Sequence, residues 1–151
     1  MEEQLQALAD ERAVINLATR YCWALDNREF HDLHNVFMPD AFAFLGGTEC
    51  DGIDAIITRI SSALTPLDGS QHLVGSHYVE LDGDQARHRC YLQAQHIMND
   101  TEGGDLWMVA GVYDDVSVRT DDGWRIKNRV LTRIWTEGNP LVTAPDLRST
   151  P

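Results

Sequence analysis

The second half of the sequence contains four segments rich in β-branched and aromatic residues, separated by short acidic runs that contain glycine. The four segments are Ser70–Leu81, Ala86–Met98, Leu106–Val118 and Trp124–Trp135. The separating runs are Asp82-Gly83-Asp84, Glu102-Gly103-Gly104-Asp105 and Asp121-Asp122-Gly123. Such runs favour hairpin turns, because glycine adopts positive φ without steric cost. We therefore predict an antiparallel meander of four long strands.

The first half has the pattern of helices instead. The segment from residue 5 to about residue 26 contains no glycine or proline. Its apolar side chains recur near helical spacing at Leu8, Ile15, Cys22 and Leu25. This pattern predicts one long amphipathic helix.

Three shorter elements are predicted between this helix and the meander. They are a short helix at Phe30–Phe37 that Pro39 would end, a strand at Ala41–Leu45, and a helix at Gly52–Leu64. Asp51 is the expected N-cap of that last helix.

Helices followed by an antiparallel meander predict the α+β fold class. A length of 151 residues fits one domain, which we place at residues 1–137, with residues 138–151 as a C-terminal tail. A strongly curved sheet packed around the N-terminal helices would enclose a ligand pocket. Because the strands carry apolar residues on both faces, as at Val109, Ala110 and Val112, we also expect a homodimer through the outer face of the sheet.

The charge of the chain limits its partners. Twenty-four acidic residues oppose 12 basic ones, for a net charge of −12. Nucleic acid and anionic membranes would be repelled by this field, so we expect neither as a partner. No apolar stretch is long enough to span a membrane, and Met1–Gln4 is acidic where a signal peptide would be basic. Three widely spaced cysteines are typical of reduced thiols, which favours a cytoplasmic location.

Five fragments of the sequence, in this order and spacing, resemble one family. They are Ala7–Asn16, Tyr21–Asp26, Gln71–Gly75, Gly111–Asp115 and Gly123–Arg129. Together they resemble the SnoaL-like branch of the cystatin-like, nuclear-transport-factor-like cone superfamily, over residues 5 to 136. The resemblance implies N-terminal helices packed in a curved antiparallel sheet. It does not select an activity, because this superfamily includes dehydratases, a dehydrochlorinase, polyketide cyclases, ketosteroid isomerase and dioxygenase small subunits.

The resemblance also implies site residues. Its dehydratase and dehydrochlorinase members share an Asp near the end of the first helix and a His at the start of the first long strand, and Asp26 and His72 stand at these positions. Tyr21 matches a Tyr of the bile-acid dehydratase, five residues before the Asp. Arg129, five residues after Trp124, matches an Arg found in several members.

Four residues are candidates for substrate binding, with less support: Arg129, His88, His96 and Trp23. His88 or His96 stands where scytalone dehydratase has a second His, and Trp23 could line an apolar pocket. Arg129 would contact a substrate carboxylate or oxyanion. If side chains alternate strictly along the strand from Trp124, Arg129 lies on the opposite face of the sheet from Trp124. A β-bulge between the two residues would bring Arg129 to the same face as Trp124.

The resembling residues predict a cofactor-independent elimination. Neutral His72 would remove a proton from carbon, Asp26 would fix its tautomer, and Tyr21 would donate a hydrogen bond to a carbonyl or to a departing hydroxyl. No metal, flavin or nucleotide is required. The expected substrate is a small, apolar, cyclic or steroid-like ketone or alcohol.

Two alternatives stay open at this point. An isomerase or polyketide-cyclase-type enzyme would use the same three residues, because both reactions also begin with proton removal from carbon. A ligand-binding module or accessory subunit would need the pocket and no catalysis. Tyr21 and Asp26 add one geometric difficulty, since five residues place them about 140° apart around a helix.

Overall fold

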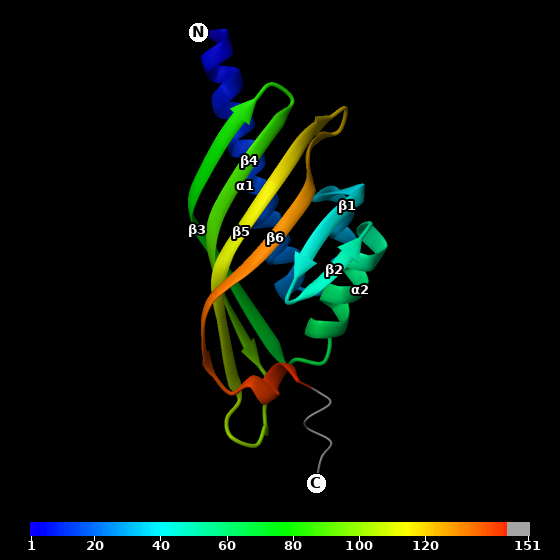
Figure 1. The fold of residues 1–151 in the computed structure, drawn as a ribbon, viewed down its shortest axis with the longest axis vertical. Coiled ribbons are helices and arrows are strands. Elements are labelled where there is room, and N and C mark those ends of the chain that lie inside the picture. Colours follow the sequence, from blue (N-terminus) through cyan, green and yellow to red (C-terminus); the bar gives the residue numbers. More distant parts are fainter. Residues whose placement is uncertain (145–151) are drawn as a thin grey trace.

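The computed structural model describes residues 1–144, and Figure 1 shows the order of their elements. The helices are α1 (Glu2–Asp26) and α2 (Ile53–Leu64), with 3₁₀ helices η1 (Phe30–Asn35) and η2 (Pro140–Thr143). The strands are β1 (Phe37–Leu45), β2 (Thr48–Asp51), β3 (Gly69–Asp82), β4 (Gln85–Ile97), β5 (Leu106–Thr120) and β6 (Gly123–Gly138). The structure therefore confirms the α+β class and the four long strands, because tight turns and β-rich segments are local signals.

The six strands form one curved sheet in the order β2-β1-β6-β5-β4-β3. The expectation of an entirely antiparallel sheet is wrong at one pairing, since β1 runs parallel to β6. Pro39 does not end a helix. It lies within β1, where the β1–β6 register shifts and a missing backbone N–H is tolerated. β2 was not predicted, and it pairs with β1 through a short hairpin.

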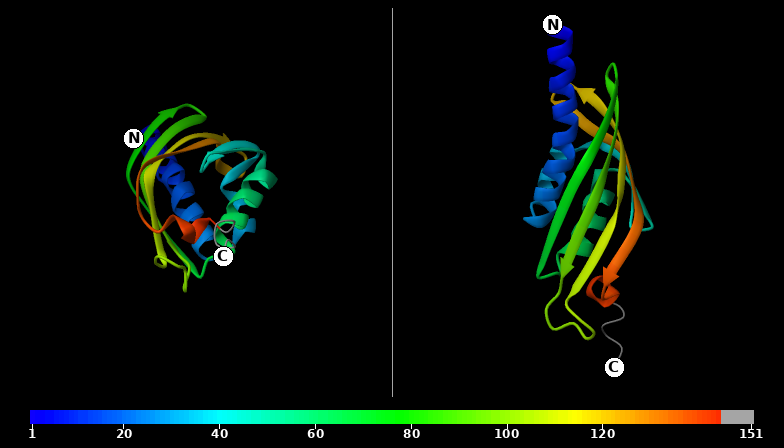
Figure 2. Two further views of the ribbon diagram at one scale, coloured as in Figure 1. Left: turned by 60° about the horizontal axis from the view of Figure 1, so that its bottom comes forward. Right: turned by 90° about the vertical axis from the view of Figure 1, so that its left-hand side faces the viewer.

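Helix α1 lies in the concave face of the sheet, as both views in Figure 2 show. Its buried stripe includes Val14, Ala18, Tyr21 and Leu25. Leu8 was expected on this stripe, yet its side chain is 63% exposed. The reason is that the first turns of α1 extend beyond the end of the sheet, where no strand covers them (Figure 1).

A buried carboxylate fastens the middle of α1 to the sheet. Asp10 accepts two hydrogen bonds from Arg119 of β5, at 2.8 and 2.7 Å, and one from Trp124 Nε1 of β6 at 3.0 Å. The Arg119 hydrogen bonds hold the pKa of Asp10 well below its usual value. The charged pair thus fixes the height of the helix along the strands.

Helix α2 and the C-terminal segment close one end of the cone. α2 buries Ile53, Ile56, Ile60 and Leu64, and its N-cap is Gly52 rather than the predicted Asp51. Gly52 has a φ of 87°, which glycine adopts without strain. Within the predicted tail, η2 packs on the core, since Val142 is fully buried. Residues 145–151 of that tail lie outside the described residues.

A β-bulge in β6 decides which side chains of that strand face the concave side. Ile126 pairs with Ser117 and Asn128 with Val116, so Lys127 is an extra residue in the ladder. Trp124 and Ile126 point inward before the bulge, and Arg129 is buried after it. The bulge that could turn Arg129 inward is therefore present.

The outer face of the sheet carries exposed apolar side chains. They include Leu73, Tyr78, Tyr91, Ile134 and Trp135, which are between 44% and 60% exposed. A homodimer through this face stays a prediction. Among the described residues, no helix is both long and apolar enough to cross a membrane.

Gly111 of β5 provides a test of the sheet geometry. A Cβ at this residue would collide with the carbonyl oxygen of Thr132 on β6, which is backbone and cannot move aside. We expect Gly111→Ala to lower the free energy of unfolding by about 1–3 kcal/mol, the usual cost of overpacking. Gly75→Ala is the matched control, since a Cβ there meets nothing within 4 Å. Urea denaturation of both variants measures the difference, and equal stability would contradict the close β5–β6 approach.

Candidate active site

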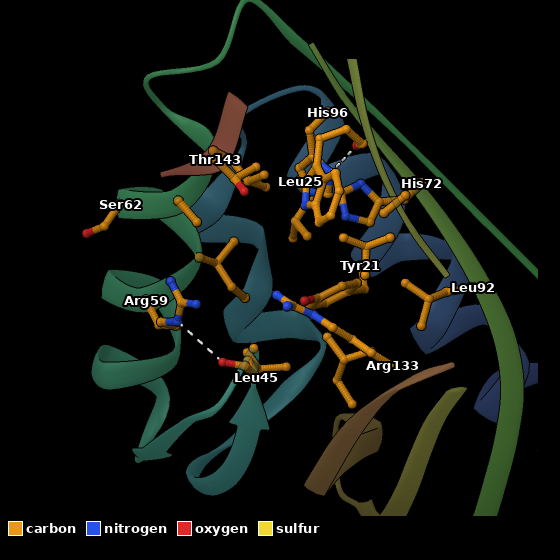
Figure 3. A pocket seen from close by; sticks show the side chains of 18 of the residues that line it. Tyr21, Leu25, Leu45, Arg59, Ser62, His72, Leu92, His96, Arg133 and Thr143 are labelled. Carbon is orange, nitrogen blue, oxygen red and sulfur yellow. Dashed lines mark hydrogen bonds between the residues drawn. The ribbon is translucent and has the colours of Figure 1, made fainter. Parts of the chain in front are cut away.

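A cavity of about 380 Å³ opens at the end of the cone where α1 ends, between the sheet, α2 and η2 (Figure 3). Apolar side chains come from every wall, among them Leu25, Leu45, Ile60, Leu92, Trp107 and Leu131. The polar side chains on its surface include Tyr21, Arg59, His72, His96, Arg133 and Thr143. A mostly apolar cavity with a few polar groups of this kind is typical of a small-molecule site.

Asp26 and His72 are joined by two short hydrogen bonds. The Nδ1 atom of His72 lies 2.7 Å from Asp26 Oδ1, and the backbone N–H of His72 donates to Asp26 Oδ2 at 2.7 Å. The His72 side chain is only 5% exposed. Because His72 lines the cavity and Asp26 stands behind it, Tyr21 and Asp26 need not share a face of the helix.

Two further residues hold the Asp26 carboxylate in place. The Ser70 hydroxyl donates to Asp26 Oδ1 at 2.9 Å, and Ser70 accepts from Arg28 Nη1 at 2.8 Å. Arg28 has a φ of 60° just after the end of α1, and its Nη1 also donates to the Leu25 carbonyl. The chain reversal after α1 thus supplies a second layer of support to the pair.

These contacts keep the Asp26 carboxylate ionised and orient the His72 ring. Burial raises the pKa of Asp26, but hydrogen bonds from the His72 side chain and backbone outweigh it, so the pKa lies below its usual value. An ionised carboxylate can only accept, so Nδ1 of His72 must carry the hydrogen. Neutral His72 then has its lone pair on Nε2, which is the arrangement that a general base needs.

The Tyr21 side chain lines the cavity from α1, and its ring packs against the buried guanidinium of Arg129. Burial raises the pKa of the Tyr21 hydroxyl, although the Arg129 charge opposes this. The Arg129 guanidinium lies 4.3 Å from the Tyr21 ring centroid and 4.0 Å from that of Tyr113, which are cation–π distances. Tyr21 therefore stays protonated at neutral pH and can donate a hydrogen bond.

His96 lies beside His72 on the cavity wall. The two rings meet edge to face with centroids 6.1 Å apart, and Nδ1 of His96 lies 3.0 Å from the Trp107 carbonyl oxygen. Because a carbonyl only accepts, this nitrogen is the donor. Burial lowers the pKa of His96, so a neutral ring presents Nε2 as an acceptor.

Arg129 and His88 do not line the cavity, which corrects their expected contact with substrate. Arg129 is 0% exposed and makes a bidentate ion pair with Asp115, at 2.7 Å for both hydrogen bonds. His88 is 1% exposed and shares a 2.9 Å hydrogen bond with His77. Both side chains point inward, but at a level of the strands that α1 covers.

Trp23 does not line the cavity as expected, and its side chain is 66% exposed. It follows the buried Tyr21 and Cys22 on α1 and lies on the side of the helix turned away from the sheet. Nothing in the sequence around Trp23 indicates which side of the helix its side chain occupies.

One further cluster has metal-ligand chemistry. The ligand atoms of His77, His88 and Cys90 all lie within 4.8 Å of one another. Burial lowers the pKa of His88 to about 4 and raises that of the Cys90 thiol to about 12. The charge of buried Arg129 adds to the lowering of the His88 pKa and opposes the rise of the Cys90 pKa without cancelling it. The geometry and charges therefore fit a neutral, hydrogen-bonded histidine pair beside a thiol.

Arg59 of α2 and Arg133 of β6 also line the cavity, although no sequence pattern predicted them there. Arg133 lies on the inward-facing side of β6 only because of the bulge at Lys127. Arg59 is on the helix that covers the open side of the cone. Neither arginine stands in a motif, so only the folded arrangement brings them together.

The fold is an α+β cone with a mostly apolar cavity at one end. Residues 6–130 match the SnoaL-like domain family, and the chain belongs to this family. An uncharacterized protein of Mycobacterium tuberculosis (strain ATCC 25618 / H37Rv), Rv2910c, is 35% identical over 133 residues, which cover 83% of this chain and 86% of that protein.

Solved structures show the same cone. The Kfla4162 protein from Kribbella flavida is 26% identical with a TM-score of 0.85, covering 91% of this chain and 99% of that one. The hexachlorocyclohexane dehydrochlorinase LinA-type3 from Novosphingobium barchaimii LL02 has a TM-score of 0.79 at 16% identity, over 91% and 94% of the two chains. At that identity the second likeness shows the fold alone.

Buried His88 predicts a pH dependence of stability. Its pKa is lowered from 6.5 to about 4 in the fold, so the unfolded chain binds more protons between these values. The free energy of unfolding should therefore fall as the pH drops from 6.5 towards 4. We expect His88→Gln to flatten this slope in urea denaturation, whatever its effect on absolute stability. His34→Gln, an exposed histidine of η1, should leave the slope unchanged, and an equal slope in all three proteins would contradict a neutral His88.

Proposed function

We propose that the protein is a cofactor-independent lyase that removes water from a small cyclic β-hydroxy ketone. The observation that carries this proposal is the doubly hydrogen-bonded pair of Asp26 and His72, with both contacts at 2.7 Å. A solvated surface acid is not expected to hydrogen-bond both the ring and the backbone of one histidine at the cavity wall. The pair leaves His72 Nε2 free as a base among apolar side chains.

The reaction begins at the carbon next to the carbonyl. His72 Nε2 takes its proton, the C–H electron pair moves toward the carbonyl, and the Tyr21 hydroxyl donates a hydrogen bond to the oxygen that gains charge. The electron pair then forms the C=C bond as the C–O bond to the hydroxyl breaks. The imidazolium, stabilised by Asp26, returns the proton to the departing hydroxide, so the products are an enone and water.

The family supports an elimination without selecting its substrate. Members of similar fold include a dehydrochlorinase, whose name describes loss of hydrogen chloride from a cyclic compound. An isomerase or a polyketide-cyclase-type enzyme would share the first step and differ in where the electron pair goes. The apolar walls formed by Leu25, Leu92 and Trp107 fit a ring system in each case.

A β-hydroxytetralone tests the proposal, because its dehydration gives a fluorescent naphthol. We expect turnover by the wild type, and a loss of about 10²-fold or more in kcat for His72→Gln and for Asp26→Asn, since a general base contributes about that much. His34→Gln is the control, because His34 is an exposed histidine of η1. Tyr21→Phe should lose kcat with little change in the pH profile.

Two outcomes would count against this function. Full activity of Asp26→Asn would mean that the pair is structural only. Binding of the tetralone without turnover by the wild type would favour the ligand-binding module or accessory subunit over the enzyme.

A further inference from the structure

We infer that the substrate of this cavity carries a carboxylate, which Arg59 and Arg133 bind together on the wall facing the acid–base residues. The inference rests on the proposed function for its reactive end, and on the two arginines alone for its anionic end. Figure 3 shows the two guanidinium groups extending toward each other across the cavity, Arg59 from α2 and Arg133 from β6.

Gly46 locates the point where the two cations meet. A Cβ built on Gly46 would lie 2.8 Å from Arg59 Nη2 and 3.6 Å from Arg133 Nη2. Gly46 has a φ of 57° at the tip of the β1–β2 hairpin, where its lack of a side chain leaves room for Arg59. Two guanidinium groups are thus held around one small space at the cavity wall.

Neither guanidinium has an acidic partner in the described chain. Arg59 donates through Nε to the Leu45 carbonyl at 3.3 Å, which leaves its two Nη groups free for a ligand. The Arg133 guanidinium has no hydrogen-bond or ion-pair partner among residues 1–144. By contrast Arg20, Arg87, Arg119 and Arg129 each bind an aspartate.

Arg12, Arg28 and Arg125 also lack an acidic ion-pair partner among the described residues, but they do not line the cavity. Arg59 and Arg133 differ from them in standing together on the cavity surface. Two adjacent guanidinium groups repel each other, and a bound anion would turn this repulsion into attraction. A carboxylate suits the site best, because its planar pair of oxygens matches the fork of a guanidinium.

The position of the cations relative to the acid–base residues sets the shape of the substrate. His72, His96 and Tyr21 lie on β3, β4 and α1, whereas Arg59 and Arg133 lie on α2 and β6. Apolar side chains such as Leu131 and Ile60 line the space around them. Burial is the main cause of the lowered pKa of His96, and the charge of Arg133 adds to it. A cyclic acid with its carboxylate at one end and an acidic C–H bond at the other spans the two walls.

Calorimetric titration with naphthoate and with its neutral counterpart naphthamide tests this inference. We expect the wild type to bind naphthoate at least about tenfold more tightly than naphthamide, since hydrogen bonds to a charged group are worth that ratio or more. Arg133→Gln and Arg59→Gln should each weaken naphthoate binding by about tenfold and leave naphthamide binding unchanged. Arg12→Gln, which removes an exposed arginine of α1, is the matched control for net charge and should change neither.

Three outcomes would overturn the inference. They are equal affinity for the acid and the amide, an equal loss in the Arg12→Gln control, and no binding of naphthoate by the wild type. Parallel loss of naphthamide binding in Arg59→Gln would indicate a deformed cavity, and Arg133→Gln, which changes an exposed side chain, then decides. The titration requires no turnover, so failure of the elimination and failure of the carboxylate site give different results.

Discussion

Two carboxylates of α1 bind the sheet, and the rest of the structure depends on them. Asp10 contacts Arg119 and Trp124 on β5 and β6, and Asp26 contacts His72 on β3. Sixteen residues of helix separate them, a rise of about 24 Å. The helix is therefore fixed to two interior strands near its start and to the edge strand β3 at its end. Because α1 stops at Asp26, it does not fill the concave face beyond that residue, and the cavity forms there between the sheet, α2 and η2.

A buried cation separates the cavity from the packed part of the cone. Arg129 is fully buried, and its cost of desolvation is offset by the bidentate pair with Asp115 and by the faces of Tyr21 and Tyr113. One of its nitrogens, Nη1, has no hydrogen-bond partner in the described chain. The aromatic rings are thus its remaining stabilising contact. Arg129 does not line the cavity, and its contact with the cavity residues is the packing of its guanidinium on the Tyr21 and Tyr113 rings.

The sequence predicted those features that depend on local signals, and missed those that depend on register. Turn residues located the four long strands, and family resemblance located Tyr21, Asp26 and His72, which the structure brings to one end of α1. The parallel β1–β6 pairing joins segments more than 80 residues apart, so no local sequence pattern predicts it. One extra residue, Lys127, turns Arg129 and Arg133 toward the concave face. Strict alternation from Trp124 places both on the outside, because the side-chain period of a strand is two.

The net charge of the chain defines what the two cavity arginines can do. A field of −12 charges repels an anionic substrate at long range, so Arg59 and Arg133 cannot act by steering it from solution. Screening limits their effect to about 8 Å at physiological salt, a distance comparable to the cavity itself. Their contribution is therefore orientation. With the carboxylate fixed on α2 and β6, the opposite end of a cyclic acid is presented to His72 Nε2, so a pair of unpartnered cations determines which C–H bond meets the base.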